Sequence, residues 1–140
     1  MNYWEFSSSS GWFSTTLPEN WSEYEDDEGT YAFFNTSEWS GNLRITPYRW
    51  EEGGVDKGPQ YVQDELNENE DAVLTKLGDW EAAFYSGEAS EDSIIYYWMI
   101  GFESTLLLCS FTADKEFIGS ESHNKELVIV EEILSSIRIN

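Results

Sequence analysis

Positive charge is scarce in this sequence. The 140 residues include seven Lys and Arg against 28 Asp and Glu, which gives a formal net charge of −21 at pH 7. The first 43 residues contain eight acids and no Lys or Arg. A surface of this kind repels nucleic acids and anionic membranes and attracts basic proteins or cations. We therefore exclude nucleic acid and membrane as partners and expect a basic protein partner.

Cysteine and histidine are nearly absent, which excludes several kinds of site. With one cysteine, Cys109, the chain cannot form an internal disulfide. Cys109 lies in the apolar run 106–111, so we interpret it as a small buried residue and not as a nucleophile. The one histidine, His123, lies in a polar stretch with nothing that marks it as a catalytic base. The nucleotide-binding patterns G-x-x-x-x-G-K-[ST] and G-x-G-x-x-G are also missing.

Long hydrophobic runs are missing as well. The longest apolar stretch, Ile94–Ile100, falls far short of the roughly 20 residues that cross a bilayer. The first residues, Met1–Ser7, lack the basic start and the apolar centre of a secretory leader. We expect a cytoplasmic protein, although a mature secreted form whose leader has been removed also fits.

Aromatic residues, in contrast, are abundant. They make up 16% of the chain and include seven Trp. Acid-rich chains with few aromatics tend to be disordered, whereas this chain has enough apolar mass to fold with its acids on the surface. Its length fits one domain. We assign residues 11–140 to that domain and residues 1–10, with the four serines Ser7–Ser10, to a flexible N-terminal lead-in.

Alternating and aromatic-rich patterns predict most of the strands. Pro47 indicates that the third strand lies at an edge or carries a bulge. The stretch Ile94–Ile100 is apolar on both sides, which is typical of a central strand covered on both faces. Residues 103–105 are predicted to form a short hairpin turn into the next strand. The predicted strands lie near residues 12–17, 31–34, 42–50, 73–77, 80–86, 93–102 and 106–113.

Two segments have helical patterns. Pro59 is suited to open the first helix, because its missing N–H is harmless there. In the second, the apolar residues between positions 127 and 137, with the one exception of Val128, fall on one arc of roughly 160° at about 100° per residue. Ser120 or Ser122 is expected to cap its start. The order β-β-β-α-β-β-β-β-α predicts an α+β fold, a largely antiparallel sheet with helices packed on it.

Three segments of the chain match a known pattern. Residues Gly11–Trp21 form an aromatic-led strand that runs into a Pro-x-x-Trp corner, and Ile133–Ile137 form a hydrophobic-Ser-Ser-Ile ending of a helix. Between them lies an aromatic strand pair, residues 94–102 and 106–113. In these features the chain resembles PsbP-like domains, in particular small uncharacterised bacterial members of Bacteroidetes type.

The resemblance covers nearly the whole chain and implies an α/β/α sandwich around a twisted, largely antiparallel sheet. Relatives in this superfamily mostly bind other proteins, and no shared catalytic site exists to carry over. The resemblance therefore implies a fold and assigns no functional residue.

The acidic loop Glu25-Asp26-Asp27-Glu28 is the first candidate site. It can be interpreted as a solvated loop of an acidic protein, as a contact for a basic partner, or as a cation site. Hard cations need about six to eight converging oxygens, and four successive acids rarely converge without a glycine-organised frame. We favour the solvated loop, with partner binding as the functional alternative.

Trp39 and Trp50 are the second candidates. They flank the third strand next to turn residues, where large aromatics are common interface anchors, although such residues also cap the edge of a core. With the neighbouring acids they make a candidate hot spot for a basic partner. The candidate partner-binding residues are therefore Glu25, Asp26, Asp27, Glu28, Trp39 and Trp50.

Other acidic patterns carry little information. Residues 67–71 place oxygen donors at alternate positions, as a calcium loop does, but Ala72 and Gly78 stand where such a loop has Gly and Glu. With 28 acids, some pairs of carboxylates must lie close together, so such pairs do not distinguish an enzyme with acid–base chemistry from a protein without it. We predict no catalytic residue, no cofactor and no metal.

These observations favour a non-enzymatic protein that binds a basic partner through its acidic surface, with one or two tryptophans as anchors. The most concrete form is an inhibitor or immunity protein of a basic toxin, because electrostatic complementarity raises association rate and specificity. Two alternatives stay open. A chaperone or adaptor for a secreted client needs an exposed apolar groove, and a carboxylate-dependent hydrolase, the more remote alternative, needs a pocket with carboxylates of raised pKa.

Overall fold

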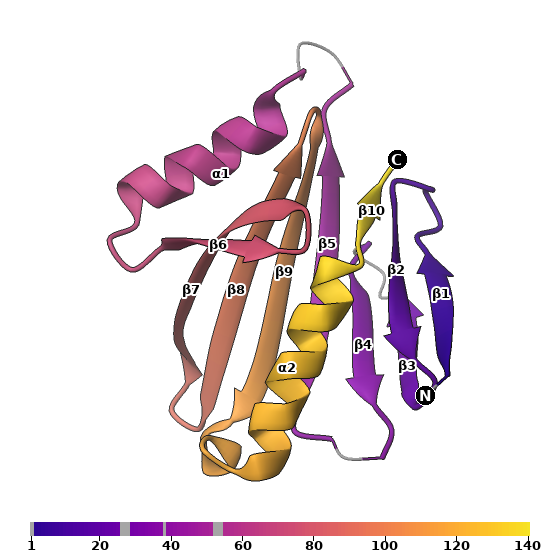
Figure 1. Ribbon diagram of the computed structural model, residues 1–140. Coiled ribbons are helices and arrows are strands. Elements are labelled where there is room, and N and C mark those ends of the chain that lie inside the picture. The colour runs from indigo at the N-terminus through magenta and orange to yellow at the C-terminus, as the bar shows by residue number, and fades with distance from the viewer. Residues whose placement is uncertain (1, 26–28, 38, 52–54) are drawn as a thin grey trace.

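The computed structural model of the protein describes residues 2–25, 29–37, 39–51 and 55–140 (Figure 1). Its elements, in chain order, are β1 (Tyr3–Ser7), β2 (Phe13–Pro18), β3 (Trp21–Glu25), β4 (Tyr31–Asn35), β5 (Gly41–Arg49), α1 (Lys57–Glu68), β6 (Val73–Leu77), β7 (Trp80–Ser90), β8 (Ser93–Phe102), β9 (Thr105–Asp114), a 3₁₀ turn (Lys115–Phe117), α2 (Glu121–Ser135) and β10 (Arg138–Ile139).

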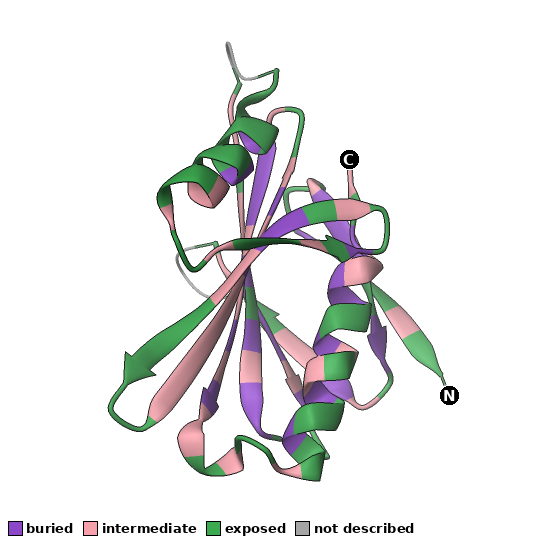
Figure 2. Cartoon of the chain, turned by 60° about the vertical axis from the view of Figure 1, so that its left-hand side comes forward, coloured by how far each residue is buried: buried purple, intermediate pink, exposed green. Residues whose placement is uncertain are grey.

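The described strands form two antiparallel sheets. The larger has seven strands in the order β3-β4-β5-β9-β8-β7-β6, and the smaller has three in the order β1-β2-β10. Helices α1 and α2 lie on opposite sides of the large sheet (Figure 2), and the small sheet lies on the side of α2 (Figure 1). This is the α+β sandwich, a twisted antiparallel sheet flanked by helices, that the sequence and the PsbP-like resemblance predict.

The main core fills the space between the large sheet and the layer made by α2 and the small sheet. Strand β5 shows the alternation behind it, because Leu43 and Ile45 are fully buried while Arg44 between them is exposed. Successive side chains of a strand point to opposite faces. The largest fully buried side chains of this core are Phe13, Phe33, Phe111, Leu17, Leu43, Ile45, Leu77, Ile100, Leu107, Ile133 and Leu134.

Helix α2 closes this core as its apolar stripe predicts. Val130 and Leu134 are fully buried, whereas Val128, which falls outside the predicted arc, is 56% exposed. Ser120 is the N-cap, and its hydroxyl accepts a hydrogen bond from the backbone N–H of His123 at 3.1 Å. A cap of this kind satisfies one of the free N–H groups in the first helical turn.

Helix α1 covers only one end of the opposite face. It packs on β7, β8 and β9, and its buried residues are Gly58 and Val62. Val62 forms a small second cluster with Ala83 and Leu106 of the sheet. In Figure 2 the lower part of this face has no helix over it. The sheet therefore has one face that carries the main core and one that is covered by α1 only at one end.

The prediction that residues 1–10 form a flexible lead-in is wrong. Tyr3–Ser7 forms β1, which pairs with β2 along its whole length, and Phe6 is 7% exposed in the main core. The serine run is ordered as well, because Ser8 Oγ accepts hydrogen bonds from the backbone N–H groups of Trp12 at 3.0 Å and Phe13 at 3.3 Å. The order of this segment comes from its partner strand and not from its own composition.

Some strand boundaries also differ from the prediction. Strands β3 and β10 are not predicted. Strand β3 ends at Glu25, the first residue of the predicted acidic loop, and β10 is only two residues long. Helix α1 begins two residues before Pro59. Strand β5 pairs with β4 only through residues 43–45, so Pro47 lies where β5 is paired on one side, as an edge position predicts.

Candidate functional site

A pocket of about 370 Å³ lies beside α1, on the partly covered face of the large sheet. Trp50 follows β5, Tyr61 comes from the first half of α1, and two leucines come from β9. Leu106 is 3% exposed, whereas Tyr48 and Tyr61 are 48% and 49% exposed, so an aromatic rim surrounds an aliphatic base. We call this the α1 pocket; its walls are Tyr48, Arg49, Trp50, Tyr61, Leu106 and Leu108.

Ring contacts and backbone bonds hold the rim in place. The ring centres of Trp50 and Tyr61 lie 5.4 Å apart at an angle of 34°. The N–H of Trp50 donates to the carbonyl oxygen of Ser104 at 3.0 Å, which fixes the end of β5 against the turn between β8 and β9. Trp50 also packs against the cluster around Val62 and Leu106. Trp50 therefore caps the edge of a core and at the same time presents its ring to the pocket.

Arg49 adds little free positive charge to the pocket. Its guanidinium lies 5.1 Å from the centre of the Trp12 ring, a cation–π contact. Its Nε donates to Thr105 Oγ1 at 3.0 Å, and its Nη2 donates to the backbone oxygen of Asn140. Trp12 and Asn140 flank strands of the small sheet, so the guanidinium is turned away from the α1 pocket.

The same face of the large sheet continues beyond α1. Directly paired residues of antiparallel strands point to the same side, and one such row crosses six strands: Tyr24, Ala32, Arg44, Ser110, Tyr97 and Tyr85. We call this row and its neighbours the open face, which consists of Ser22, Tyr24, Ala32, Phe34, Asn42, Arg44, Thr46, Tyr85, Gly87, Ile95, Tyr97, Ser110 and Thr112.

The open face has no carboxylate among its residues, and its one charged group is Arg44. Aromatic rings cover much of it. The rings of Tyr85 and Tyr97 stack with their centres 4.8 Å apart, and the ring of Tyr24 lies 6.3 Å from that of Phe34. The centres of protein interfaces are depleted in charged residues and enriched in Tyr, Phe and Arg. In a chain with 28 acids, this composition distinguishes the open face from the rest of the surface.

Acids are instead concentrated around α1. Burial, and then the charge of Glu65 on α1, raise the pKa of the Tyr85 phenol. Glu65 thus lies at the border of the open face. Against two lysines, Lys57 and Lys76, the described residues between 51 and 81 include nine acids: Glu51, Asp56, Asp64, Glu65, Glu68, Glu70, Asp71, Asp79 and Glu81.

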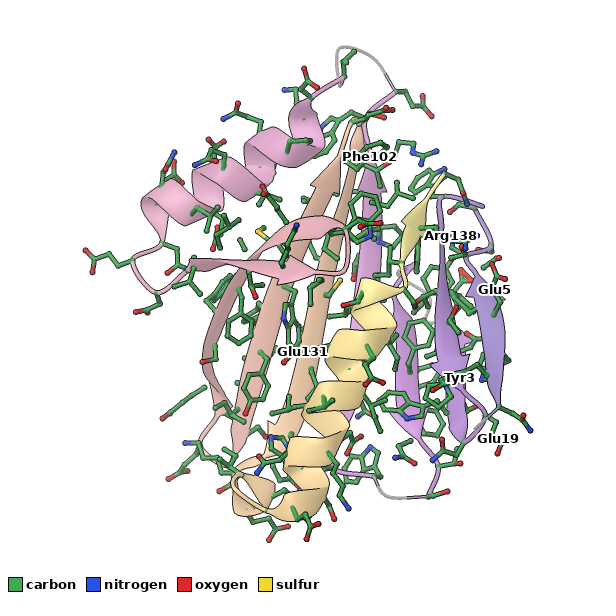
Figure 3. The ribbon with its side chains drawn as sticks, viewed as in Figure 1. Tyr3, Glu5, Glu19, Phe102, Glu131 and Arg138 are labelled. Carbon is green, nitrogen blue, oxygen red and sulfur yellow. The ribbon has the colours of Figure 1, made fainter. Side chains whose placement is uncertain are left out.

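A second hollow, of about 470 Å³, lies on the other side of α1. Its walls include Leu66 of α1, Leu74 of β6 and Phe102 at the end of β8. Leu74 and Phe102 are 58% and 40% exposed, and Figure 3 shows Phe102 at the same end of the molecule as α1. Unlike the described walls of the α1 pocket, its walls include carboxylates, among them that of Asp79, together with Lys76.

The two candidate tryptophans are not brought together. They flank the nine-residue strand β5 at opposite ends, and a strand of this length spans roughly 30 Å. Trp39 is 50% exposed, and its Nε1 donates to Oδ1 of Asn42, an open-face residue, at 3.1 Å. Trp50 lines the α1 pocket at the other end. They therefore mark the two ends of one surface and do not form a single hot spot.

The candidate acids lie apart from both tryptophans as far as the structure describes them. Glu25 ends β3, and its carboxylate accepts hydrogen bonds from Ser9 Oγ at 3.1 and 3.3 Å. This contact draws Glu25 towards the turn between β1 and β2. Asp26, Asp27 and Glu28 lie outside the described residues.

A buried polar network joins α2 to the sheet, and the sequence pattern does not predict it. The Ser40 hydroxyl donates to Glu126 Oε2 and lies 3.2 Å from His123 Nδ1, while His123 Nε2 lies 3.3 Å from the Tyr96 hydroxyl. A neutral imidazole with its proton on Nδ1 satisfies both ring nitrogens, and burial lowers the pKa of His123. His123 and Glu126 are three residues apart and therefore lie on the same side of the helix. This spacing is the sequence signal that could have suggested the network.

These residue types resemble a hydrolase triad, but their arrangement does not. Ser40, His123 and Glu126 are each at most 2% exposed, so a substrate cannot reach the hydroxyl. The hydroxyl also donates to the carboxylate, whereas a nucleophilic serine must give its proton to the imidazole. We interpret the network as a structural connection between α2, β8 and the start of β5.

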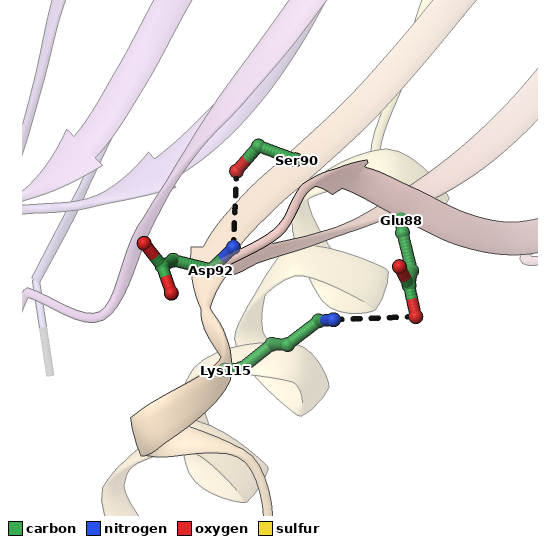
Figure 4. A network of polar contacts seen from close by, with 4 residues as sticks. All are labelled: Glu88, Ser90, Asp92 and Lys115. Atoms are coloured by element: carbon green, nitrogen blue, oxygen red, sulfur yellow. Dashed lines mark hydrogen bonds and ion pairs between the residues drawn. The ribbon is translucent and has the colours of Figure 1, made fainter.

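The turn between β7 and β8 carries a smaller polar network (Figure 4). Lys115 Nζ lies 3.2 Å from Glu88 Oε1, its backbone N–H donates to Asp92 O at 2.8 Å, and Ser90 Oγ accepts from the N–H of Asp92 at 3.3 Å. The lysine supplies the positive charge among these acids.

Within the described ranges, no group of three or more His, Cys, Asp or Glu is placed to hold a metal ion. The helices of the described chain are too short or too polar to cross a membrane.

The whole chain, residues 1–140, matches a family described as "Domain of unknown function (DUF3805)". The chain belongs to this family. A crystal structure from Bacteroides thetaiotaomicron VPI-5482 matches it with a TM-score of 0.82 and 29% identity, over 100% of this chain and 49% of that chain. The DUF3805 chain thus spans about half the length of that neighbour. No curated protein matches it in sequence.

Two more distant structures share the fold. CyanoP, the cyanobacterial PsbP of Synechocystis sp. PCC 6803, matches with a TM-score of 0.56 and 12% identity, over 99% of this chain and 92% of CyanoP. LpqN of Mycobacterium tuberculosis, described as involved in cell envelope biogenesis, matches with a TM-score of 0.59 and 10% identity, over 99% and 91% of the two chains. At these identities the likeness shows the fold alone. These two structures confirm the PsbP-like fold that the resemblance implies.

Proposed function

We propose that this DUF3805 domain is a non-enzymatic binding domain for a basic protein, and that the open face together with the α1 pocket is its contact surface. The observation that carries the proposal is the contrast between a carboxylate-free, tyrosine-rich face and a chain of net charge −21. An apolar centre supplies contact area, and the surrounding acids attract positive charge.

The partner is expected to have a complementary pattern, an apolar centre with a basic rim. Attraction between opposite charges acts mainly on the association rate and weakens as salt screens it. An inhibitor or immunity protein of a basic toxin is the most concrete form of the proposal, because such a protein must find its target quickly. The support for this form is the net charge.

Affinity capture tests the proposal. The immobilised protein is exposed to a lysate of the source organism at low salt, and bound proteins are released by a salt step. We expect a basic protein that binds in a one-to-one complex once it is purified. Capture of many unrelated clients would favour the chaperone or adaptor alternative, and capture of no basic protein at low salt would contradict the proposal.

A further inference from the structure

We propose that the α1 pocket receives one large apolar side chain, of phenylalanine or leucine type, from a basic segment of the partner. This inference rests on the proposed function, because it specifies what the partner presents to one end of the contact surface. Three properties of the pocket carry it: its size, the chemistry of its walls and the acids close to it in the chain.

The size of the pocket suits a side chain. Pockets that enclose a small-molecule ligand usually measure about 300–1,000 Å³, and the α1 pocket, at about 370 Å³, lies at the lower end of that range. The pocket is also formed before any partner arrives, since Trp50 and Tyr61 are already in ring contact. A preformed hollow lowers the ordering cost of binding.

The walls favour an apolar guest over a charged one. Leu106 and Leu108 form the base, three aromatic rings form the sides, and no carboxylate is among the described residues that line the hollow. A charged group buried there would lose its hydration without gaining a counter-charge. Arg49, the charged residue among the described walls, directs its guanidinium to Trp12, Thr105 and Asn140. It is therefore not available to bind an anionic guest.

Two exposed acids are close in the chain to residues that form or hold the pocket. Glu51 follows Trp50 directly, and Glu103 precedes Ser104, whose carbonyl oxygen bonds the N–H of Trp50. Both carboxylates belong to exposed residues. Residues next to the inserted side chain are therefore expected to be Lys or Arg. The half-exposed rings of Tyr48 and Tyr61 would screen the inserted group from water, as residues around a hot spot do.

Two synthetic peptides test the inference. One has four lysines around a single phenylalanine, and the other has alanine in place of the phenylalanine. Binding is measured at low salt by NMR shifts of the indole N–H signals. We expect the phenylalanine peptide to bind at least about tenfold more tightly, with the largest shift at Trp50. The variants Tyr61→Ala and Trp50→Ala should abolish this preference, and Tyr3→Ala, on β1 of the small sheet (Figure 3), should keep it.

The outcomes separate the two proposals. Equal binding of both peptides, or a preference that survives Tyr61→Ala, would overturn the pocket inference and leave charge-driven partner binding intact. Binding of neither peptide at low salt would count against the proposed function itself. Binding of free p-cresol as tight as that of the phenylalanine peptide would identify a small-molecule pocket and overturn the inference. Because Tyr61 is half exposed, its variant keeps the test valid if Trp50→Ala fails to fold.

Discussion

Gly101 of β8 lies directly against Gly58 of α1. A Cβ atom on Gly101 would overlap the carbonyl oxygen of Gly58 and stand 2.7 Å from the nitrogen of Pro59. A Cβ on Gly58 would in turn overlap the carbonyl oxygen of Thr105. The neighbours in each case are backbone atoms, which cannot rotate away. The glycine pair therefore sets the distance between α1 and the sheet, and with it the position of Tyr61, three residues further along the helix.

Replacing Gly101 by alanine should displace α1. The substitution Gly101→Ala is expected to lower the free energy of unfolding by about 1–3 kcal/mol, the usual cost of overpacking, and to weaken binding at the α1 pocket. Chemical denaturation measures the first effect. Gly87→Ala on β7 is the matched control, because a Cβ there meets nothing within 4 Å, and it should change stability by less than about 0.5 kcal/mol. Equal effects of the two variants would contradict this account of α1.

The stability of the protein should depend on pH through His123. Burial lowers the pKa of this imidazole below the value of about 6.5 for an unfolded chain. The unfolded state then binds the proton more readily, so the stability that neutral His123 contributes is fully present above about pH 6.5 and is lost as pH falls through the folded pKa. The chain has one histidine, so an NMR titration of its ring protons gives the midpoint directly. A midpoint above 6.5 would refute this prediction.

The variant Tyr96→Phe sharpens that measurement. The Tyr96 hydroxyl faces Nε2 of His123 at 3.3 Å, and a hydroxyl that donates to this nitrogen stabilises the neutral ring. Its removal should raise the midpoint of His123. The variant His123→Gln should show a flatter dependence of the unfolding free energy on pH between about 5 and 6.5.

Salt should stabilise the protein. A net charge of −21 destabilises the compact state by self-repulsion, and added salt screens it. The described residues contain only two ion pairs that salt would weaken, Lys115–Glu88 and Lys125–Glu121, and exposed pairs contribute little. We expect the melting temperature to rise from low to physiological salt. A melting temperature that falls over this range would show that self-repulsion is not the dominant effect.

Cys109 should be inert in the folded protein. It is 1% exposed in the main core, and burial raises the pKa of its thiol well above the ordinary value. The thiolate is the reactive form, so a thiol reagent should label the protein only after unfolding, with one equivalent per chain. Rapid labelling under native conditions would mean that β9 opens locally.

The parts of the fold that local pattern determines could be predicted from the sequence. Helix α2 follows from the spacing of its apolar residues, and β8 and β9 follow from long apolar runs and a tight turn. Strand β1 could not be predicted, because five residues with one buried side chain, Phe6, are ordered by pairing with β2. Strand pairing is a property of two segments, and periodicity describes only one.

The candidate site, like the fold, could be predicted from the sequence only in part. Trp50 is identified by its place beside a strand end, but Tyr48, Tyr61 and Leu106 come from three different elements and meet only in the folded chain. The open face depends on strand register, since a shift of one residue would turn Tyr97 to the other side of the sheet. The positions free of acid are therefore visible as one surface only in three dimensions.

The most direct test of the central claim is a side-by-side capture with three proteins: the wild type, the double variant Tyr24→Ala with Tyr97→Ala, and the control Tyr3→Ala. Tyr24 and Tyr97 belong to the open face, and Tyr3 belongs to the small sheet on the other side. The account predicts that the wild type and Tyr3→Ala retain the same basic protein until the salt step, and that the double variant loses it. Equal retention by all three proteins, or no basic protein on any of them, would contradict the account.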